Sequence, residues 1–347
     1  MSKKSKIIII GIESSCDETA AALVEIKAGK FKILSNIVSS QIKIHKKYGG
    51  VVPEVAARNH IVNILPVIDR ALTEAKIKPA RIDKIAVTFG PGLITSLMVG
   101  LETAKTLAFV WKKPIAAVNH MKAHLYANWL ANQAIKYPAI CLTVSGGHTE
   151  LILIKNQTNL KKVGQTVDDA AGEAFDKVAK LLEIGYPGGP MISRLAQTGN
   201  PKAFKLARPM INSKDFNFSF SGLKTSVLYA YENSKLKTKN LKLKANSCKL
   251  TADMCASFQQ AAVDVLAAKT IKAALHFGAK TVMLSGGVAA NQLLRETLQA
   301  EIKKLKLNFV MPDKSLCTDN AAMIAAAGYF EKPIDWKKIR VNPNLSI

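Results

Sequence analysis

The chain has 347 residues, enough at roughly 150 residues per domain for about two domains. Its 48% apolar residues exclude an intrinsically disordered chain, and charges interrupt its apolar runs too often for a membrane protein. Lysine and arginine number 49 against 25 acidic residues, and the net charge of +24 favours an anionic partner such as nucleic acid. Nearly all of these cations are lysines, which specify little geometry, so a background bias of composition is the alternative explanation.

The first part of the chain is predicted to fold as βββαβαβα. Its elements are, in order, strands at residues 7–12, 19–26 and 31–39, a helix opening at Pro53, a strand at 84–89, a helix at 92–110, a strand at 115–118 and a helix that carries His120 and His124. Proline is well tolerated in a first helical turn. Glu13 ends the first apolar run too early for a signal peptide, so we interpret the run as a buried strand.

A second round of elements follows. It comprises strands at 139–144 and 149–154, alanine-rich helices, a long helix at 251–277, a strand at 281–284 and an alanine-rich final helix. In each round an apolar strand runs into Ser-Gly-Gly, at 145–147 and at 285–287. Two such turns predict paired lobes that face a shared cleft, because open sheets of this kind bind ligands beyond the carboxyl ends of their strands.

The cysteines indicate a reducing compartment. There are five of them, and no two form a Cys-x-x-Cys pair: Cys16, Cys141, Cys248, Cys255 and Cys317. Neither a zinc ribbon nor a disulfide framework fits this pattern. We therefore expect a cytoplasmic protein. We expect no membrane segment, because the long apolar stretch at 93–111 contains Glu102 and Lys105.

His120 and His124 are the best candidates for metal ligands, because residues four apart share one helical face. The alternative is that two histidines merely occur on this helix. A zinc metalloprotease would have glutamate directly after the first histidine, where this chain has Met121. Asp319 is the candidate third ligand, although aspartate at a helix start is also a common cap. Two histidines and one aspartate would leave coordination positions open, as catalytic sites do.

Glycine turns and carboxylates form the other candidate sites. The turns at 143–149, 186–190 and 284–291 offer backbone amides that suit a phosphate or nucleotide, although each alone could be an ordinary tight turn. The segment 168–177 places Asp169, Glu173 and Asp176 on one helical face, as a polar pocket or a solvated surface. The segment 232–250 contains six lysines, which predicts an exposed, mobile insertion or a nucleic-acid contact.

Ten motifs in chain order resemble the TsaD family of tRNA N6-adenosine threonylcarbamoyltransferases. They are GIESSCDET, HKKYGGVVPEVAARNH, FGPGLITSLMVG, NHMKAH, VSGGHTEL, DDAAGEAFDKVAK, YPGGP, FSFSGLKT, SGGVAANQLLR and CTDNAAMIA. The resemblance implies an α/β fold of the actin, sugar-kinase and Hsp70 type, with two ribonuclease-H-like lobes around a nucleotide cleft. We expect an N-terminal lobe of residues 1–136 plus 320–347 and a C-terminal lobe of residues 137–319 that carries the lysine-rich insertion 232–250.

The resemblance also implies an activity and a site. The activity is transfer of a threonylcarbamoyl group from threonylcarbamoyl-AMP to the N6 amine of the adenosine 3′ of the anticodon, in tRNAs that read ANN codons, with release of AMP. One divalent metal per subunit is implied on His120, His124 and Asp319, with Fe²⁺ expected first and Zn²⁺ second. Substrate contacts are implied at Thr143, Val144, Ser145, Gly146, Gly147, Asp176, Gly189 and Asn291.

The chemistry of this transfer adds a hypothesis about two carboxylates. Adenine N6 is a poor nucleophile, so Asp17 or Glu18, in the turn after the first strand, is expected to orient or deprotonate it. By resemblance, the partners are tRNA, a TsaB-like paralogous subunit and a TsaE-like P-loop ATPase. The alternative function is a nucleotide-binding ATPase or chaperone-like module of the same fold that transfers nothing. A secreted protease, the third possibility, lacks both a signal peptide and a general base.

Overall fold

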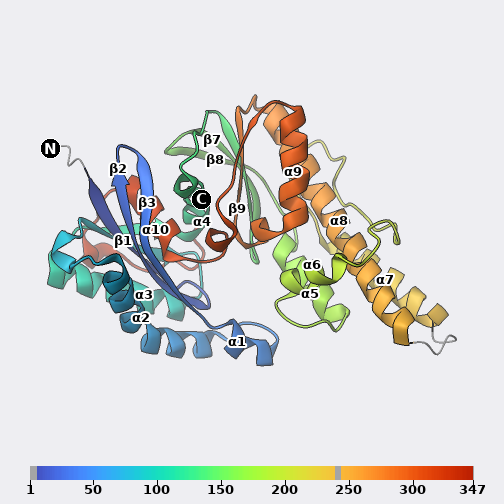
Figure 1. Cartoon of the computed structure of the whole chain (residues 1–347), viewed down its shortest axis with the longest axis horizontal. Helices are drawn as coiled ribbons and strands as arrows, with labels where there is room; N and C mark the ends of the chain where they lie inside the picture. The colour runs from blue at the N-terminus through green and yellow to red at the C-terminus, as the bar shows by residue number, and fades with distance from the viewer. Residues whose placement is uncertain (1–5, 239–243, 347) are drawn as a thin grey trace. The chain divides into compact units, whose positions relative to one another are not determined.

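The computed structural model describes residues 6–238 and 244–346. Contacts divide the chain into two compact units, Met1–Ala134 with Val310–Ile347, and Ile135–Phe309. Each unit is built on a five-stranded mixed sheet (Figure 1). The chain rejoins the first unit at residue 310, whereas we expected this return at 320, so Asp319 lies in the same unit as His120 and His124.

The first unit has a sheet in the order β3-β2-β1-β4-β5. Its strands are β1 (Ile7–Glu13), β2 (Glu18–Lys27), β3 (Lys30–Ser40), β4 (Lys84–Gly90) and β5 (Ile115–Asn119). Its helices are α1 (Ile42–His45), α2 (Pro53–Ala75), α3 (Ile94–Trp111), α4 (His120–Tyr126) and α10 (Ala321–Phe330). Strand β1 pairs antiparallel with β2 and parallel with β4, so the βββαβαβα prediction is confirmed.

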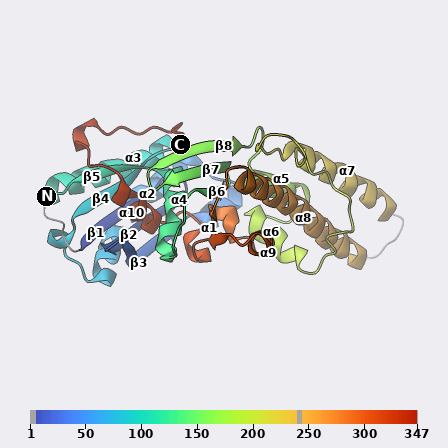
Figure 2. The ribbon, with the colours of Figure 1, turned by 90° about the horizontal axis from the view of Figure 1, so that it is seen from above.

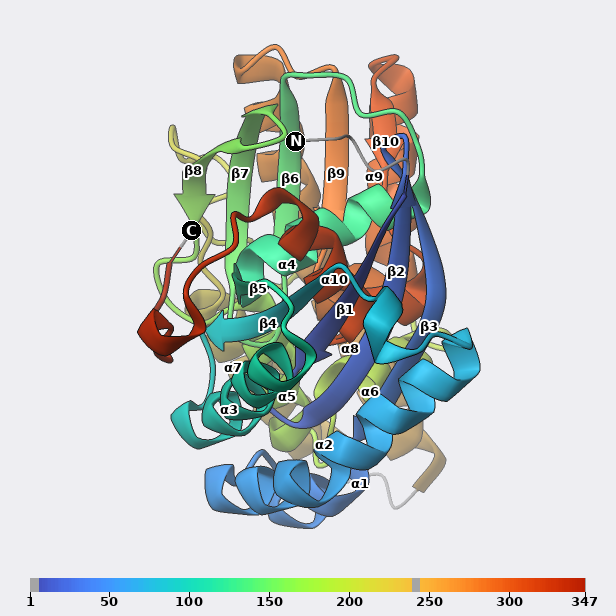
Figure 3. The same ribbon diagram turned by 90° about the vertical axis from the view of Figure 1, so that its left-hand side faces the viewer.

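Strand β1 is buried on both faces, and each face packs against different helices. Ile8, Ile10 and Ile12 point to one face, where they join an apolar cluster with residues of α2 and α3. Residues of the opposite parity, including Gly11 and Glu13, face helix α10 because successive side chains of a strand alternate. Figure 3 shows α2 and α3 on one side of this sheet and α10 on the other.

Helix α10 lies unusually close to β1. A Cβ atom at Gly11 would stand 2.1 Å from the carbonyl oxygen of Ala321 and 2.7 Å from the amide nitrogen of Ala325. The first eight residues of α10 are buried, and five of them are alanines. Small side chains on the helix and a glycine on the strand therefore allow the two backbones to touch. This contact fixes the start of α10 beside the carboxyl end of β1.

The second unit repeats the sheet with strands taken from a later part of the chain. Its strands are β6 (Ala139–Val144), β7 (Thr149–Asn156), β8 (Asn159–Gln165), β9 (Thr281–Ser285) and β10 (Asn308–Val310). Its helices are α5 (Ala171–Leu181), α6 (Gly188–Ala196), α7 (Ser221–Thr238), α8 (Lys244–His276) and α9 (Gln292–Lys304). Helices α7 and α8 lie side by side (Figure 2).

The two sheets have the same topology. Read from its antiparallel edge, the second sheet has the order β8-β7-β6-β9-β10, which matches β3-β2-β1-β4-β5. Strand β6 pairs antiparallel with β7 and parallel with β9, as β1 does with β2 and β4. The predicted α/β class with two ribonuclease-H-like lobes is confirmed. Among residues 6–238 and 244–346, every helix is too short or too polar to span a lipid bilayer.

Three elements of the second unit were not expected from the sequence, and one differs. Strand β8, strand β10 and helix α9 were not predicted. The lysine-rich segment 232–250 was expected to be irregular, but α7 extends to Thr238 and α8 starts at Lys244. Residues 239–243 of that segment lie outside the described residues, so its predicted mobility and its nucleic-acid contact stay predictions.

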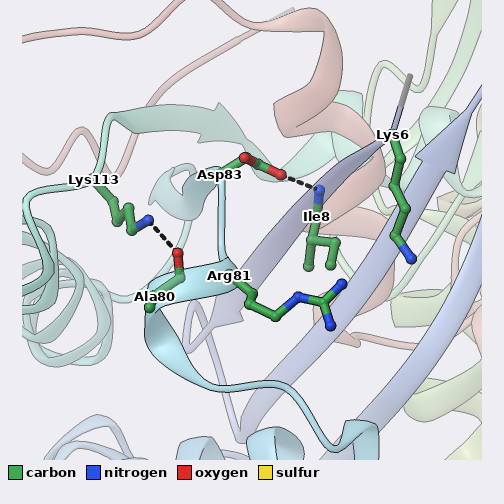
Figure 4. Close-up of a pocket in the computed structure, with 6 residues that line it drawn as sticks. All are labelled: Lys6, Ile8, Ala80, Arg81, Asp83 and Lys113. Atoms are coloured by element: carbon green, nitrogen blue, oxygen red, sulfur yellow. Dashed lines mark hydrogen bonds between the residues drawn. The ribbon is translucent and has the colours of Figure 1, made fainter. Parts of the chain in front are cut away.

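A pocket of about 290 Å³ opens where strand β1 begins (Figure 4). Its lining consists of Lys6, Ile8, Ala80, Arg81, Asp83 and Lys113. Within it the Asp83 carboxylate accepts the amide of Ile8 at 2.8 Å, and the Lys113 ammonium donates to the carbonyl oxygen of Ala80 at 2.8 Å. Sheets of this type bind ligands at the opposite, carboxyl ends of their parallel strands. We therefore assign this pocket no part in the chemistry.

The close contact at Gly11 predicts that alanine destabilises the protein more at this position than at a glycine with open space around it. Gly11→Ala is expected to lower the free energy of unfolding by about 1–3 kcal/mol, because the new methyl group overlaps the backbone of α10. The matched control is Gly50→Ala, where no atom lies within 4 Å of the new Cβ and the change should stay within about 0.5 kcal/mol. Urea denaturation measures both. Equal stability of the two variants would contradict the packing described.

Candidate metal centre and substrate-binding turns

His120 and His124 lie on the short helix that follows β5. Asn119 ends the strand and caps the helix, because its side-chain oxygen accepts the amides of Met121 at 2.8 Å and Lys122 at 3.1 Å. Helix α4 then presents the two imidazoles one turn apart, with ring centroids 4.7 Å from each other. The strand end and its cap thus fix where both histidines point.

Asp319 lies two residues before α10, and it does not cap that helix. Asn320 does, because its side-chain oxygen accepts the amide of Met323 at 3.1 Å. The Asn320 amide group also donates to the carbonyl oxygens of Thr318 and Leu316. The capping explanation for Asp319 is therefore excluded, and its carboxylate is left to face the histidines.

The three predicted ligands converge within the first unit. The Nε2 atom of His124 lies 3.0 Å from Oδ1 of Asp319, and the Nε2 atom of His120 lies 3.5 Å from the same oxygen. One ligand atom from each of the three residues lies within 4.8 Å of the others. Two imidazole nitrogens and a carboxylate oxygen at these separations can share one metal ion.

Glu13 is the site residue that the sequence analysis did not single out. It ends β1, its side chain is buried, and its Oε2 lies 3.2 Å from Nδ1 of His120. The same carboxylate accepts the Thr88 hydroxyl and the Ser15 amide, each at 2.5 Å. A carboxylate behind a histidine fixes which ring nitrogen faces the metal. The available signal was the position of Glu13 at the carboxyl end of the central strand.

Electrostatics couple these groups. Burial opposes the charge on His120, but the carboxylates of Asp319 and Glu13 outweigh it and hold the pKa of His120 well above the usual range. Burial would likewise raise the pKa of Asp319, but the charge of His120 and hydrogen bonds from both histidines hold that pKa far below its usual range. Without a metal ion, His120 and Asp319 therefore form a partly buried ion pair, with the buried carboxylate of Glu13 on the other side of the imidazole.

The donor set fits a divalent metal ion. Imidazole nitrogen and carboxylate oxygen suit borderline ions such as Fe²⁺ and Zn²⁺. The Nδ1 atom of His124 is buried with no hydrogen-bond partner in the described part of the chain, so no protein group competes for the orientation that points Nε2 at Asp319. His120 has Glu13 behind it, as ligating histidines usually do.

Asp17 ends the turn between β1 and β2, and Glu18 is the first residue of β2, within the same unit. Both side chains are partly exposed. The Ser40 hydroxyl donates to Oε1 of Glu18 at 3.0 Å. Burial, followed by the negative charges of Asp319 and Asp17, raises the pKa of Glu18 to about 10. The structure thus brings this turn into the electrostatic range of the predicted metal ligands.

In the second unit, the residues 143–147 cover the end of β6 and the turn after it. Thr143 is buried and its hydroxyl lies 3.0 Å from that of Ser285, which joins the two Ser-Gly-Gly strands. Val144 is buried at the end of β6, and the carbonyl oxygen of Ser145 accepts the amide of Gly172 at 3.2 Å. Among the described residues, no atom beyond the chain neighbours lies within 4 Å of a Cβ at Gly146 or Gly147, so this turn has an open face.

Helix α6 links the remaining predicted contacts. Its first residue, Gly188, donates its amide to Oδ1 of Asp176 at 2.7 Å, and burial raises the pKa of that aspartate. Gly189 follows with free space around its Cα. Farther along the helix, Ser193 accepts a hydrogen bond from the side chain of Asn291 at 3.1 Å. Asp176, Gly189 and Asn291 are therefore brought together around one helix.

The carboxylates of the 168–177 segment separate into two groups. Asp169 and Glu173 both pair with the ammonium of Lys177, at 2.6 Å and 2.8 Å. These two share Lys177, but Glu173 is well exposed whereas Asp169 is mostly buried, and Asp176 points to α6.

Metal uptake by this site is expected to release a proton near neutral pH. A raised pKa keeps His120 protonated in the metal-free chain, and a metal ion must displace that proton, so the apparent affinity should rise with pH. Calorimetry in two buffers of different ionisation enthalpy measures the release. His120→Ala should weaken binding at least about 10-fold, whereas His276→Ala, on the exposed end of α8, should bind as the parent does. Affinity that does not change between pH 6 and pH 8 would contradict the coupling.

Comparison with known proteins places the chain in a family. The sequence profile of the family described as TsaD, tRNA N6-adenosine threonylcarbamoyltransferase, matches residues 32–326. A protein of that name from Thermosipho melanesiensis is 50% identical over 98% of this chain and 100% of its own length. Another from Thermomicrobium roseum is 49% identical over 93% of this chain and 92% of its own length.

Solved structures agree in fold. The HypF protein of T. kodakarensis superimposes with a TM-score of 0.58 at 14% identity, over 95% of this chain and 48% of its own. Component A of the Acidaminococcus fermentans (R)-2-hydroxyglutaryl-CoA dehydratase gives a TM-score of 0.50 at 18% identity, over 93% and 98% of the two chains. These likenesses confirm the predicted architecture of the actin, sugar-kinase and Hsp70 type. The profile match and the near-complete coverage by relatives about half identical in sequence show that the chain belongs to the TsaD family of tRNA N6-adenosine threonylcarbamoyltransferases.

Proposed function

We propose that this chain transfers the threonylcarbamoyl group from threonylcarbamoyl-AMP to N6 of the adenosine 3′ of the anticodon, in tRNAs that read ANN codons. The N6 nitrogen forms a bond to the carbamoyl carbon, the bond from that carbon to the phosphate oxygen breaks, and AMP leaves. The nitrogen loses one proton in the process. The observation that carries this proposal is the convergence of His120, His124 and Asp319 in a member of the TsaD family.

We assign those three residues to one divalent ion per subunit, Fe²⁺ in the first place and Zn²⁺ in the second. When bound, the ion supplies positive charge that stabilises the phosphate of the leaving AMP. Glu13 fixes the ring of His120 through Nδ1. Asp319 brings a carboxylate oxygen to both imidazoles. The chain thus orients three ligands before any ion arrives, which reduces the cost of assembling the site.

We assign the adenylate contacts to the second unit. The amide of Ser145 donates to the carbonyl oxygen of His148 at 2.8 Å, but the space beside Gly146 and Gly147 is open, so a ligand can approach the backbone of these two glycines. Its neighbours Thr143 and Val144 hold the strand end in place. Asp176, Gly189 and Asn291, gathered around α6, complete the set by resemblance. Binding through many fixed groups favours a catalyst that works mainly by orientation.

Asp17 and Glu18 are the candidates to orient the amine or accept its proton. A pKa of about 10 means that Glu18 is protonated at neutral pH in the metal-free chain. The charge of Asp319 is the second largest cause of that shift, so neutralising this charge lets Glu18 ionise more readily. An ionised carboxylate at the amine can act as a general base, and a protonated one can only orient it.

The partners that we propose are tRNA, a TsaB-like paralogous subunit and a TsaE-like P-loop ATPase, in the cytoplasm. The net charge of +24 suits the polyanion. For the TsaB-like subunit we propose a docking surface on α2 and α3, two helices that pack against each other. Its members are apolar side chains exposed by about half or more: Ile61, Val62, Leu65, Ile94 and Met98. Exposed apolar side chains on two helices that pack together favour an interaction surface.

A charge in that surface should prevent docking. Leu65→Asp is expected to weaken binding of the TsaB-like subunit at least about 10-fold, because the aspartate would be buried unpaired in the interface. Leu275→Asp is the matched control, since Leu275 is equally exposed on α8 of the second unit, at 59% against 61% for Leu65. Size-exclusion chromatography and calorimetry measure the complex. Unchanged binding by Leu65→Asp would rule out this surface.

The proposed activity is tested by mass spectrometry of tRNA nucleosides. The chain, incubated with both partners, ATP, preformed threonylcarbamoyl-AMP and tRNA, is expected to produce N6-threonylcarbamoyladenosine. With preformed threonylcarbamoyl-AMP, Glu18→Gln should slow the transfer about 100-fold if Glu18 takes the proton, because the amide cannot accept it. The matched control is Glu25→Gln, the same change at the far end of the same strand, β2, where Glu25 pairs with Lys6.

The outcomes separate the two claims. Absence of the modified nucleoside with the parent chain would overturn the proposed function. Modification at the parent rate by Glu18→Gln would overturn only the role of Glu18 as a base, and Glu25→Gln should match the parent in either case.

A further inference from the structure

The junction of the turn with β2, which carries Asp17 and Glu18, is held from one side by a histidine that the proposed chemistry does not use. His60 lies on α2, and its side chain is fully buried. Its Nε2 lies 3.0 Å from the carbonyl oxygen of Cys16, and its Nδ1 lies 2.8 Å from the hydroxyl of Thr19. One imidazole therefore spans the two residues that flank the candidate catalytic pair.

The chemistry of the two partners fixes the roles of the ring nitrogens. A carbonyl oxygen only accepts, so Nε2 of His60 carries the hydrogen and donates it to Cys16. Nδ1 is then an acceptor, and the Thr19 hydroxyl donates to it. Both bonds are made by the neutral imidazole, and burial lowers the pKa of His60, which favours that form. A buried ring with both nitrogens satisfied holds its position firmly.

A second contact ties the same turn to the same helix. The amide of Gln41 donates to the carbonyl oxygen of Asp17 at 3.0 Å, and the Gln41 side chain donates to the carbonyl oxygen of Ala56 on α2 at 3.3 Å. His45 in turn contacts the Gln41 side-chain oxygen at 3.2 Å. Helix α2 thus reaches Cys16 and Thr19 directly through His60 and reaches Asp17 through Gln41. None of these bonds uses the side chains of Asp17 or Glu18.

We propose that His60 is a positioning residue that holds residues 16–19, the end of the turn and the start of β2, so that Asp17 and Glu18 meet the adenosine amine correctly. The proposal rests on the proposed function, because it concerns the same transfer. His60 touches neither the substrate nor the metal ligands in this account. Its loss should lower the rate constant of transfer and leave metal content and donor affinity unchanged, since a misplacement of about 1 Å can cost about 100-fold in rate.

The test uses single turnovers with preformed threonylcarbamoyl-AMP, tRNA, the metal-loaded chain and its partner subunits. A single-turnover rate constant does not depend on how much of the protein is folded, so a merely structural role would not change it. His60→Leu removes both hydrogen bonds and should slow transfer about 10- to 100-fold. His60→Gln, whose amide both donates and accepts, should recover most of that loss. Thr19→Val removes one bond with little change of shape and should fall between the two.

Ser35→Ala is the matched control. The Ser35 hydroxyl donates to the carbonyl oxygen of Ala71 at 2.8 Å, so this variant also removes a buried hydrogen bond to α2, but one remote from the turn. It should cost about 1 kcal/mol of stability and leave the rate constant unchanged. Hydrogen exchange adds a readout independent of activity, since the amides of residues 16–19 should exchange faster in His60→Leu and Thr19→Val only.

Each outcome decides the proposal. Transfer at the parent rate by Thr19→Val together with folded His60→Leu would overturn it. If His60→Leu does not fold, the rate and exchange of Thr19→Val decide alone. If the parent chain makes no modified nucleoside, the proposed function fails. In that case hydrogen exchange still tests the positioning role, and unchanged exchange at residues 16–19 in His60→Leu and Thr19→Val would overturn it as well.

Discussion

The carboxylate of Asp319 is the interaction on which the first unit's site depends. It lies against two imidazoles in surroundings where an unpaired charge would be costly. His120 keeps its charge because Asp319 and Glu13 lie on its two sides, and Asp319 keeps its own because His120 faces it. His120, His124 and Asp319 would hold a divalent cation in place of this proton, and the ion would supply positive charge at the site.

The fold supplies this arrangement through backbone contacts and helix caps. Gly11 lets α10 touch β1, and Asn320 caps α10, so the residue before the cap presents its carboxylate beside the end of the strand. On the neighbouring strand, Asn119 performs the same task for α4 and its two histidines. Two capped helices that start near the carboxyl ends of parallel strands thus meet over Glu13. On the opposite face of β1, Ile10 and Ile12 belong to the apolar cluster that packs the strand against α2 and α3.

The sequence predicted the parts of this design that have a local signal. Buried apolar runs marked the central strands, and the four-residue spacing of the histidines marked their shared face. Strand β8 was not predicted, because it is a half-exposed strand at the edge of its sheet and Lys161 and Lys162 interrupt its apolar pattern. The role of Glu13 could not be read locally, because only the sheet register and the position of α4 show which side chain it meets.

Two consecutive residues of α2 lie on opposite faces of the helix. His60 points inward to the turn after β1, whereas Ile61 is 64% exposed on the outer side. The buried ring of His60 joins α2 to Cys16 and Thr19, so the position of α2 helps to fix the position of these two residues. The same helix therefore defines both a surface that solvent contacts and the geometry of a turn that carries two candidate catalytic carboxylates. A residue such as His60, which has no contact with the metal ligands, can for this reason matter to chemistry more than its place in the core suggests.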